Sequence, residues 1–107
     1  MKDRTGDRIE FLNSDSVSMI FDLSRSGVAT LSRQAKNAGT VLKVELNDLV
    51  LDATVVYSQE RTDGYRIGLH FENVSPEKQS QIDVFVDNFS RGVPVSCRIA
   101  DDIHTKA

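Results

Sequence analysis

The chain has 107 residues, of which 39% are hydrophobic and 27% charged, and its net charge is −3 at pH 7. This composition is typical of one soluble globular domain with a single core. A net negative charge argues against the broad cationic surface on which non-specific binding of DNA or RNA depends, although a local group of arginines would still suit a small anionic ligand.

Cysteine content and hydropathy indicate the compartment. Cys97 is the single cysteine, so no internal disulfide is expected. No apolar run approaches the ~20 residues needed to span a bilayer, and the N-terminus carries no apolar secretion segment. We therefore expect a cytoplasmic protein without direct membrane insertion.

The first elements in chain order are an arm and two strands. Residues 1–8 are polar and are expected to form an arm that is mobile without a ligand. Residues 9–12 are predicted as a short strand, and residues 13–15 as a turn. A strand with a clearer pattern than 9–12 is predicted over residues 16–22. Its side chains alternate with a period of two: Val17, Met19 and Phe21 alternate with Ser16, Ser18 and Ile20.

Alternation continues through four further strands and two hairpins. A strand is predicted over 27–31, and a hairpin joins 42–46 to 49–57 across Asn47-Asp48, two residues that tolerate positive φ. A second hairpin across residues 61–64 leads to a return strand. That strand places Tyr65, Ile67, Leu69 and Phe71 on one face and Arg66, Gly68 and His70 on the other.

A helix is predicted to follow. Ser75 suits the N-cap and Pro76 the first helical position, while Gly92 and Pro94 would end the helix. One apolar stripe at helical spacing either closes an open end of a barrel, which we favour, or faces a partner protein. It consists of Ile82, Phe85, Val86 and Phe89. After the helix, residues 93–99 alternate like a strand and residues 101–107 resemble a frayed end.

Two motifs carry the candidate chemistry. Asp22, Ser24 and Gly27 form D-x-S-x-x-G at the end of an apolar strand. A carboxylate acceptor, a hydroxyl and a glycine backbone on one bend can hold the edge of a planar base. Upstream, Arg4 and Arg8 form R-x-x-x-R, and two guanidinium groups on a short arm suit phosphates. Together the motifs indicate a nucleotide.

The two motifs in this order resemble the PilZ family of bacterial cyclic di-GMP receptors. The segment Tyr65–Glu77, with Gly68 and Phe71 as G-x-x-F, resembles the last barrel strand of that family and the entry to its helix. The resemblance implies a mainly β fold, a small antiparallel PilZ-like barrel of about six strands with one C-terminal α-helix. Its parts would be an arm at 1–8, the barrel at 9–74, the helix at 75–91 and a tail at 92–107.

The resemblance implies a cytoplasmic, non-enzymatic receptor for cyclic di-GMP, a second messenger with two guanines and two phosphodiesters. Arg4 and Arg8 would grip phosphates or the acceptor edge of guanine. Asp22 would accept from guanine N1–H and N2–H₂, Ser24 would add a hydroxyl contact, and Gly27 would offer its backbone. Arg25, inside the motif, either stacks on a base or points into solvent. The bound receptor would change its surface and regulate a protein partner.

Other interpretations stay open at this point. Asp22 and Ser24 also suit a turn in which their side chains satisfy backbone amides, and the two upstream arginines also suit a solvated surface. The chain would then be a degenerate PilZ-like interaction module that binds no nucleotide, docking a partner through the helix stripe or the strand at 93–99. Only 14 positions separate Arg8 from Asp22, which fits such a module.

The remaining reactive residues indicate neither catalysis nor a metal. His70 and His104 have no third ligand at metal spacing. Cys97 has no arrangement that would make it a nucleophile and is expected to be a small core residue. We expect no enzymatic activity, no metal, no cofactor and no nucleic-acid partner.

Overall fold

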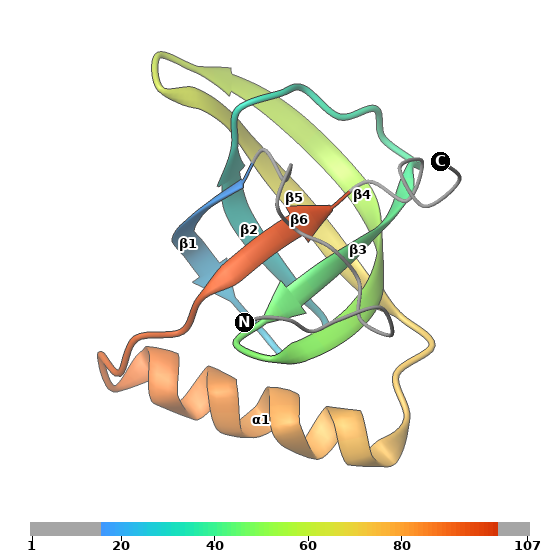
Figure 1. Cartoon of the computed structure of the whole chain (residues 1–107), viewed down its shortest axis with the longest axis vertical. Helices are drawn as coiled ribbons and strands as arrows, with labels where there is room; N and C mark the ends of the chain where they lie inside the picture. The colour runs from blue at the N-terminus through green and yellow to red at the C-terminus, as the bar shows by residue number, and fades with distance from the viewer. Residues whose placement is uncertain (1–15, 101–107) are drawn as a thin grey trace, which may run out of the picture.

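The computed structural model describes residues 16–100 of the chain (Figure 1). These residues form six strands and one helix. In chain order they are β1 (Ser16–Leu23), β2 (Gly27–Ser32), β3 (Val41–Leu46), β4 (Leu49–Arg61), β5 (Gly64–Glu72), α1 (Pro76–Ser90) and β6 (Cys97–Ala100).

The strands form one antiparallel sheet in the order β1-β2-β5-β4-β3-β6. The sheet curves strongly, so that its two end strands, β1 and β6, approach each other and the sheet becomes a half-barrel. Helix α1 lies across one end of this barrel (Figure 1). The predicted fold class, a small antiparallel barrel with a single helix near the C-terminus, is therefore confirmed.

The core lies inside the curved sheet and beneath the helix. Ile82 of α1 is fully buried, and Phe85, Val86 and Phe89 pack partly buried against the same cluster. The interpretation of the apolar stripe as a cover for the barrel end is thus confirmed. The strands contribute alternating buried side chains, chiefly Leu42, Val44, Leu46, Leu51, Val55, Ile67, Leu69 and Ile99.

The ends of α1 follow the local sequence. The Ser75 hydroxyl accepts a hydrogen bond from the Lys78 amide at 3.2 Å and satisfies one of the free N–H groups of the first turn. Pro76 needs no such partner because it has no N–H. The helix ends before Gly92, and the Val93 amide donates back to the Asn88 carbonyl at 2.8 Å.

Two strands depart from the pattern of the sequence. In β1, Ile20 packs against the core whereas Met19 is 43% exposed, and the pairing of β1 with β2 is irregular. In the tail, the strand is confined to Cys97–Ala100. Pro94 has no N–H to donate to a ladder, and the segment before Cys97 instead bonds to Asn47 through Ser96.

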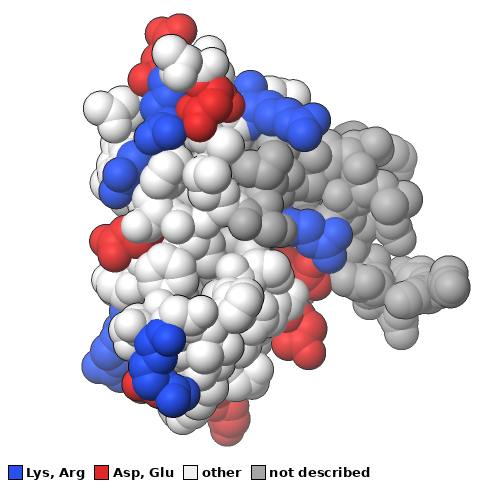
Figure 2. Space-filling model, turned by 90° about the vertical axis from the view of Figure 1, so that its left-hand side faces the viewer, with Lys and Arg blue, Asp and Glu red and all other residues white. Residues whose placement is uncertain are grey.

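Several predictions lie outside the described residues: the arm at 1–8, the strand at 9–12 and the frayed end at 101–107. Over residues 16–100, α1 is too short and too polar to cross a membrane. On the side of the molecule that carries β1, the central surface is largely uncharged, and basic and acidic side chains lie around its margins (Figure 2).

Burial makes the single thiol a test of the packing. Cys97 is fully buried in β6, and burial raises the pKa of its thiol to about 12. At pH 8 only about one molecule in ten thousand would carry the reactive thiolate. We expect no reaction of the folded protein with a thiol reagent such as Ellman's reagent, and one equivalent of reaction in denaturant. Prompt labelling of the folded protein would contradict this packing.

Candidate ligand-binding site

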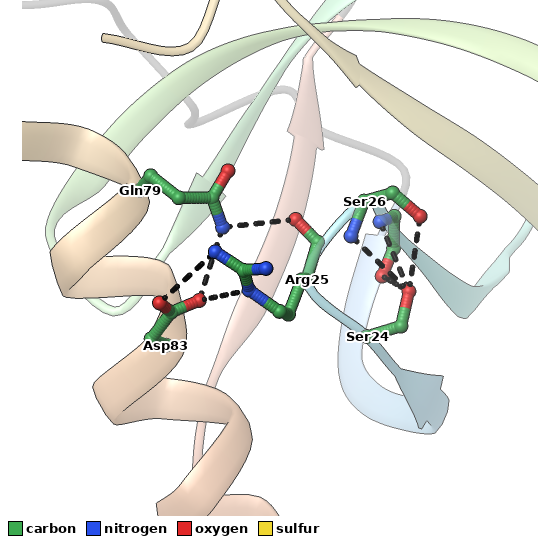
Figure 3. A network of polar contacts seen from close by, with 6 residues as sticks. Ser24, Arg25, Ser26, Gln79 and Asp83 are labelled. Atoms are coloured by element: carbon green, nitrogen blue, oxygen red, sulfur yellow. Dashed lines mark hydrogen bonds and ion pairs between the residues drawn. The ribbon is translucent and has the colours of Figure 1, made fainter. Parts of the chain in front are cut away.

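The bend between β1 and β2 is closed by the Ser24 side chain. Its hydroxyl oxygen accepts from the Ser26 amide at 3.3 Å and from the Gly27 amide at 3.2 Å, while the Ser24 amide donates to the Gly27 carbonyl at 2.9 Å (Figure 3). Serine hydroxyls commonly stabilise turns in this way. Ser24 therefore shapes the bend, whatever else it contacts.

Gly27 is required by the sheet itself. A Cβ at this position would lie 2.2 Å from the carbonyl oxygen of Leu69 in β5, much closer than any side chain tolerates. The next link between the bend and β5 is a hydrogen bond from the Phe71 amide to the Ser26 carbonyl at 2.8 Å. The glycine thus lets β2 approach β5 closely and fixes the bend on the outer surface of the barrel.

Two irregularities in strand pairing decide which side chains face outward here. In β1 the register shifts between Ile20 and Asp22, and in β4 it shifts between Val55 and Tyr57. Because a strand alternates its faces with a period of two, an extra residue moves every later side chain to the opposite face. Ile20 and Val55 face the core, whereas Asp22 and Tyr57 both lie on the outer face.

Asp22 and Tyr57 are the two ends of one row across four strands. The pairs are Asp22 with Ala29, Ala29 with Gly68, and Gly68 with Tyr57. Three strand spacings separate the ends by about 14 Å. The Tyr57 ring packs over Gly68, where a Cβ would lie 2.2 Å from it, and a hollow remains between this ring and Asp22.

This hollow is a pocket of about 270 Å³. The volume lies just below the ~300–1,000 Å³ of typical small-molecule sites, so the pocket suits part of a ligand such as one base. The bend contributes one wall and β4 and β5 the other. The lining residues are Asp22, Ser24, Ser26, Gly27, Val28, Ala29, Val56, Tyr57, Arg66, Gly68, Leu69 and His70.

Arg66 brings a positive charge to the pocket. Its Nε donates to the Tyr57 hydroxyl at 3.0 Å, and its guanidinium lies 5.0 Å from the centre of the Phe21 ring. The guanidinium of Arg61, which pairs with Asp63, lies over the same ring at 4.6 Å. Within residues 16–100, Arg66 has no carboxylate partner, so its charge is available to an anion.

Asp22 is the complementary group. Its carboxylate is exposed on the pocket wall and has no hydrogen-bond or ion-pair partner in the part of the chain that the structure describes. A carboxylate accepts hydrogen bonds only, so it fits the donor edge of a planar ring. The pocket therefore combines an acceptor on one wall with a cation and an aromatic ring on the other.

Arg25 points away from the pocket. Its guanidinium donates from Nε to Asp83 Oδ1 at 2.8 Å and from Nη2 to Asp83 Oδ2 at 3.3 Å (Figure 3). Gln79 Nε2 donates both to the Arg25 carbonyl at 3.3 Å and to Asp83 Oδ1 at 3.0 Å. The bend is thus attached to α1 through its central residue.

The sequence-predicted site residues are partly brought together. Asp22, Ser24 and Gly27 line one pocket, and Arg25 lies outside it on the helix side. Arg4 and Arg8 fall outside the described residues. Tyr57, Arg66 and His70 were not among the site residues predicted from the sequence. Arg66 and His70 could have been found, because they were predicted to share the polar face of the return strand. No feature of the sequence marked Tyr57.

Comparison with known proteins identifies the family. The PilZ domain matches residues 6–88, well over half of the chain, and the chain therefore belongs to the PilZ domain family. This family consists of cyclic di-GMP-binding modules that act as effectors rather than enzymes. No curated protein and no solved structure gave a significant match.

The close approach at Gly27 yields a stability prediction. Gly27→Ala would force the Cβ onto the Leu69 carbonyl, and we expect a loss of about 3 kcal/mol in the free energy of unfolding, as for a severely overpacked site. Ser26→Ala removes only a long contact to Ser24 Oγ and should change stability by less than about 0.5 kcal/mol. Urea denaturation of both variants provides the comparison. Equal stabilities would contradict the close packing of β2 on β5.

Proposed function

We propose that this chain binds cyclic di-GMP at the pocket between the β1–β2 bend and β5, and that binding alters the surface presented to a protein partner. The observation that carries the proposal is the unpartnered carboxylate of Asp22 facing Arg66 and Tyr57 across a floor of small residues. Membership of the PilZ family supports the choice of ligand.

Guanine suits the two walls of the pocket. Its N1–H and N2–H₂ are neighbouring donors on one edge, and the Asp22 carboxylate would accept from both in charge-assisted hydrogen bonds. The base would lie between Asp22 and the Tyr57 ring, which itself packs over Gly68. Ser24 would act mainly by holding the bend, since its hydroxyl already accepts two amides there.

The phosphates need positive charge, since each phosphodiester carries one negative charge. Arg66 would supply one cation from β5, held in place by the Tyr57 hydroxyl and the Phe21 ring. We propose that Arg4 and Arg8 supply the others from the N-terminal arm. Micromolar affinity corresponds to about −8 kcal/mol, which a few charge-assisted contacts and one stacked base can provide.

The alternative is an interaction module that binds a partner without any nucleotide. In this alternative, the docking surface for the partner is the apolar stripe of the helix or the strand of the tail. In this structure Ile82 and the stripe around it pack on the core, and β6 pairs with β3. Because both features are engaged within the domain, they lend less support to this alternative than the pocket lends to nucleotide binding.

The first test is calorimetric titration with cyclic di-GMP, with GTP and cyclic AMP as controls. We expect binding by the wild-type chain, and at least about tenfold weaker binding by Asp22→Asn, because the amide loses a charged acceptor and places an N–H₂ donor against the guanine donors. Arg8→Ala should weaken binding as well, through loss of a phosphate contact.

Asp48→Asn is the matched control, since Asp48 is an exposed aspartate in the β3–β4 turn and does not line the pocket. It should bind as the wild type does. Absence of both heat and a shift in melting temperature with cyclic di-GMP would refute the proposal. Binding that Asp22→Asn leaves unchanged would place the ligand elsewhere.

A second test concerns the charge of Arg66. Arg66→Met keeps an unbranched apolar side chain but removes the guanidinium, so we expect about fivefold weaker binding of cyclic di-GMP at low salt. The difference from the wild type should shrink in about 0.5 M NaCl, where charges a few ångströms apart in solvent are screened. Arg33→Met, which changes an exposed arginine outside the pocket, is the control. Unchanged affinity of Arg66→Met would remove Arg66 from the site.

A further inference from the structure

We propose that Arg25, Gln79 and Asp83 form a clamp that positions the ligand-binding bend on helix α1, so that nucleotide affinity and the seating of the helix are coupled. This inference rests on the proposed function of the pocket. Arg25 is a positioning residue in it, because its side chain lies on α1 and not among the residues that line the pocket.

The clamp holds both the side chain and the main chain of the bend. Two hydrogen bonds join the Arg25 guanidinium to both oxygens of Asp83, and Gln79 donates to the Arg25 carbonyl itself (Figure 3). The residues on either side of Arg25, Ser24 and Ser26, line the pocket. A movement of Arg25 would therefore move the pocket wall directly.

The helix side of the clamp is organised in advance. Gln79 and Asp83 are one turn apart on α1, and Gln79 Nε2 donates to Asp83 Oδ1 at 3.0 Å. Hydrogen bonds from Arg25 and then from Gln79 hold the pKa of Asp83 below its ordinary value, so the carboxylate stays ionised at neutral pH. Its neighbour Ile82 is fully buried, which fixes this part of the helix against the core.

The strength of the clamp is limited by solvent. The side chains of Arg25 and Asp83 are 69% and 44% exposed, and exposed ion pairs are screened. Such a pair can be broken without unfolding the domain, which suits a coupling element better than a structural one. Linkage is reciprocal: whatever displaces this part of α1 would weaken nucleotide binding, and the nucleotide would favour the seated helix by the same factor.

The test compares cyclic di-GMP affinity in Arg25→Ala, Asp83→Ala and the double variant. Each single variant should bind about threefold to fivefold more weakly than the wild type, as loss of an exposed ion pair allows. The double variant should bind no more weakly than either single variant, because both break one clamp. Asp83→Glu, which keeps a carboxylate, should recover part of the affinity.

Two controls separate this role from general stability. Asp87→Ala breaks another exposed ion pair of α1, with Arg91, and should leave affinity unchanged. In the ligand-free protein, Arg25→Ala and Asp83→Ala should speed amide hydrogen exchange at Ser26 and Gly27, while the urea midpoint stays close to that of the wild type.

The outcomes are distinguishable. If the wild type does not bind cyclic di-GMP, the proposed function fails, and hydrogen exchange at the bend alone decides whether the clamp exists. If the wild type binds but Asp83→Ala binds equally well, the coupling is refuted and the function stands. Tighter binding by Asp83→Ala would also refute the clamp, since Asp83 would then be competing with the nucleotide for Arg25.

Discussion

The candidate site depends on which way side chains point after two interruptions of the strand ladder. A regular β1 would place Asp22 on the same face as Ile20, inside the barrel, and a regular β4 would do the same to Tyr57 with Val55. The extra residues at Phe21 and Val56 turn the side chains of Asp22 and Tyr57 to the outer face instead. An acceptor and an aromatic ring thereby reach the outer surface on opposite sides of Gly68, and the interior keeps its apolar lining.

The residues of the D-x-S-x-x-G motif differ in their roles: two of them stabilise the fold, and one is available to a ligand. Ser24 closes the bend by accepting two amides, and Gly27 makes room for the Leu69 carbonyl. Both residues would be needed in a domain that bound nothing. Asp22 differs, because nothing in the described part of the fold uses its carboxylate. Within this motif, the aspartate therefore carries most of the information about a ligand.

Local patterns predicted the strands, the hairpins and the start of α1, because period-two alternation, Asn47-Asp48 and Ser75-Pro76 act through neighbouring residues. They failed where distant strands decide the outcome. No local signal marks the irregular pairing of β1 with β2, in which Ile20 packs against the core and Met19 is exposed. The partner of Arg25 lies 58 positions away on a helix face, and only the packed fold brings the two together.

The strand that completes the barrel, β6, lies near the C-terminal end of the described residues. β6 contributes Cys97 and Ile99 to the core and pairs with β3, more than 50 positions earlier in the chain, and α1 intervenes between β5 and β6. During synthesis on the ribosome, Val44 and Leu46 therefore remain partly uncovered until residue 100 has left the exit tunnel. Nascent chains shorter than this expose an unpaired β3 edge, where a chaperone or a second nascent chain can add a strand.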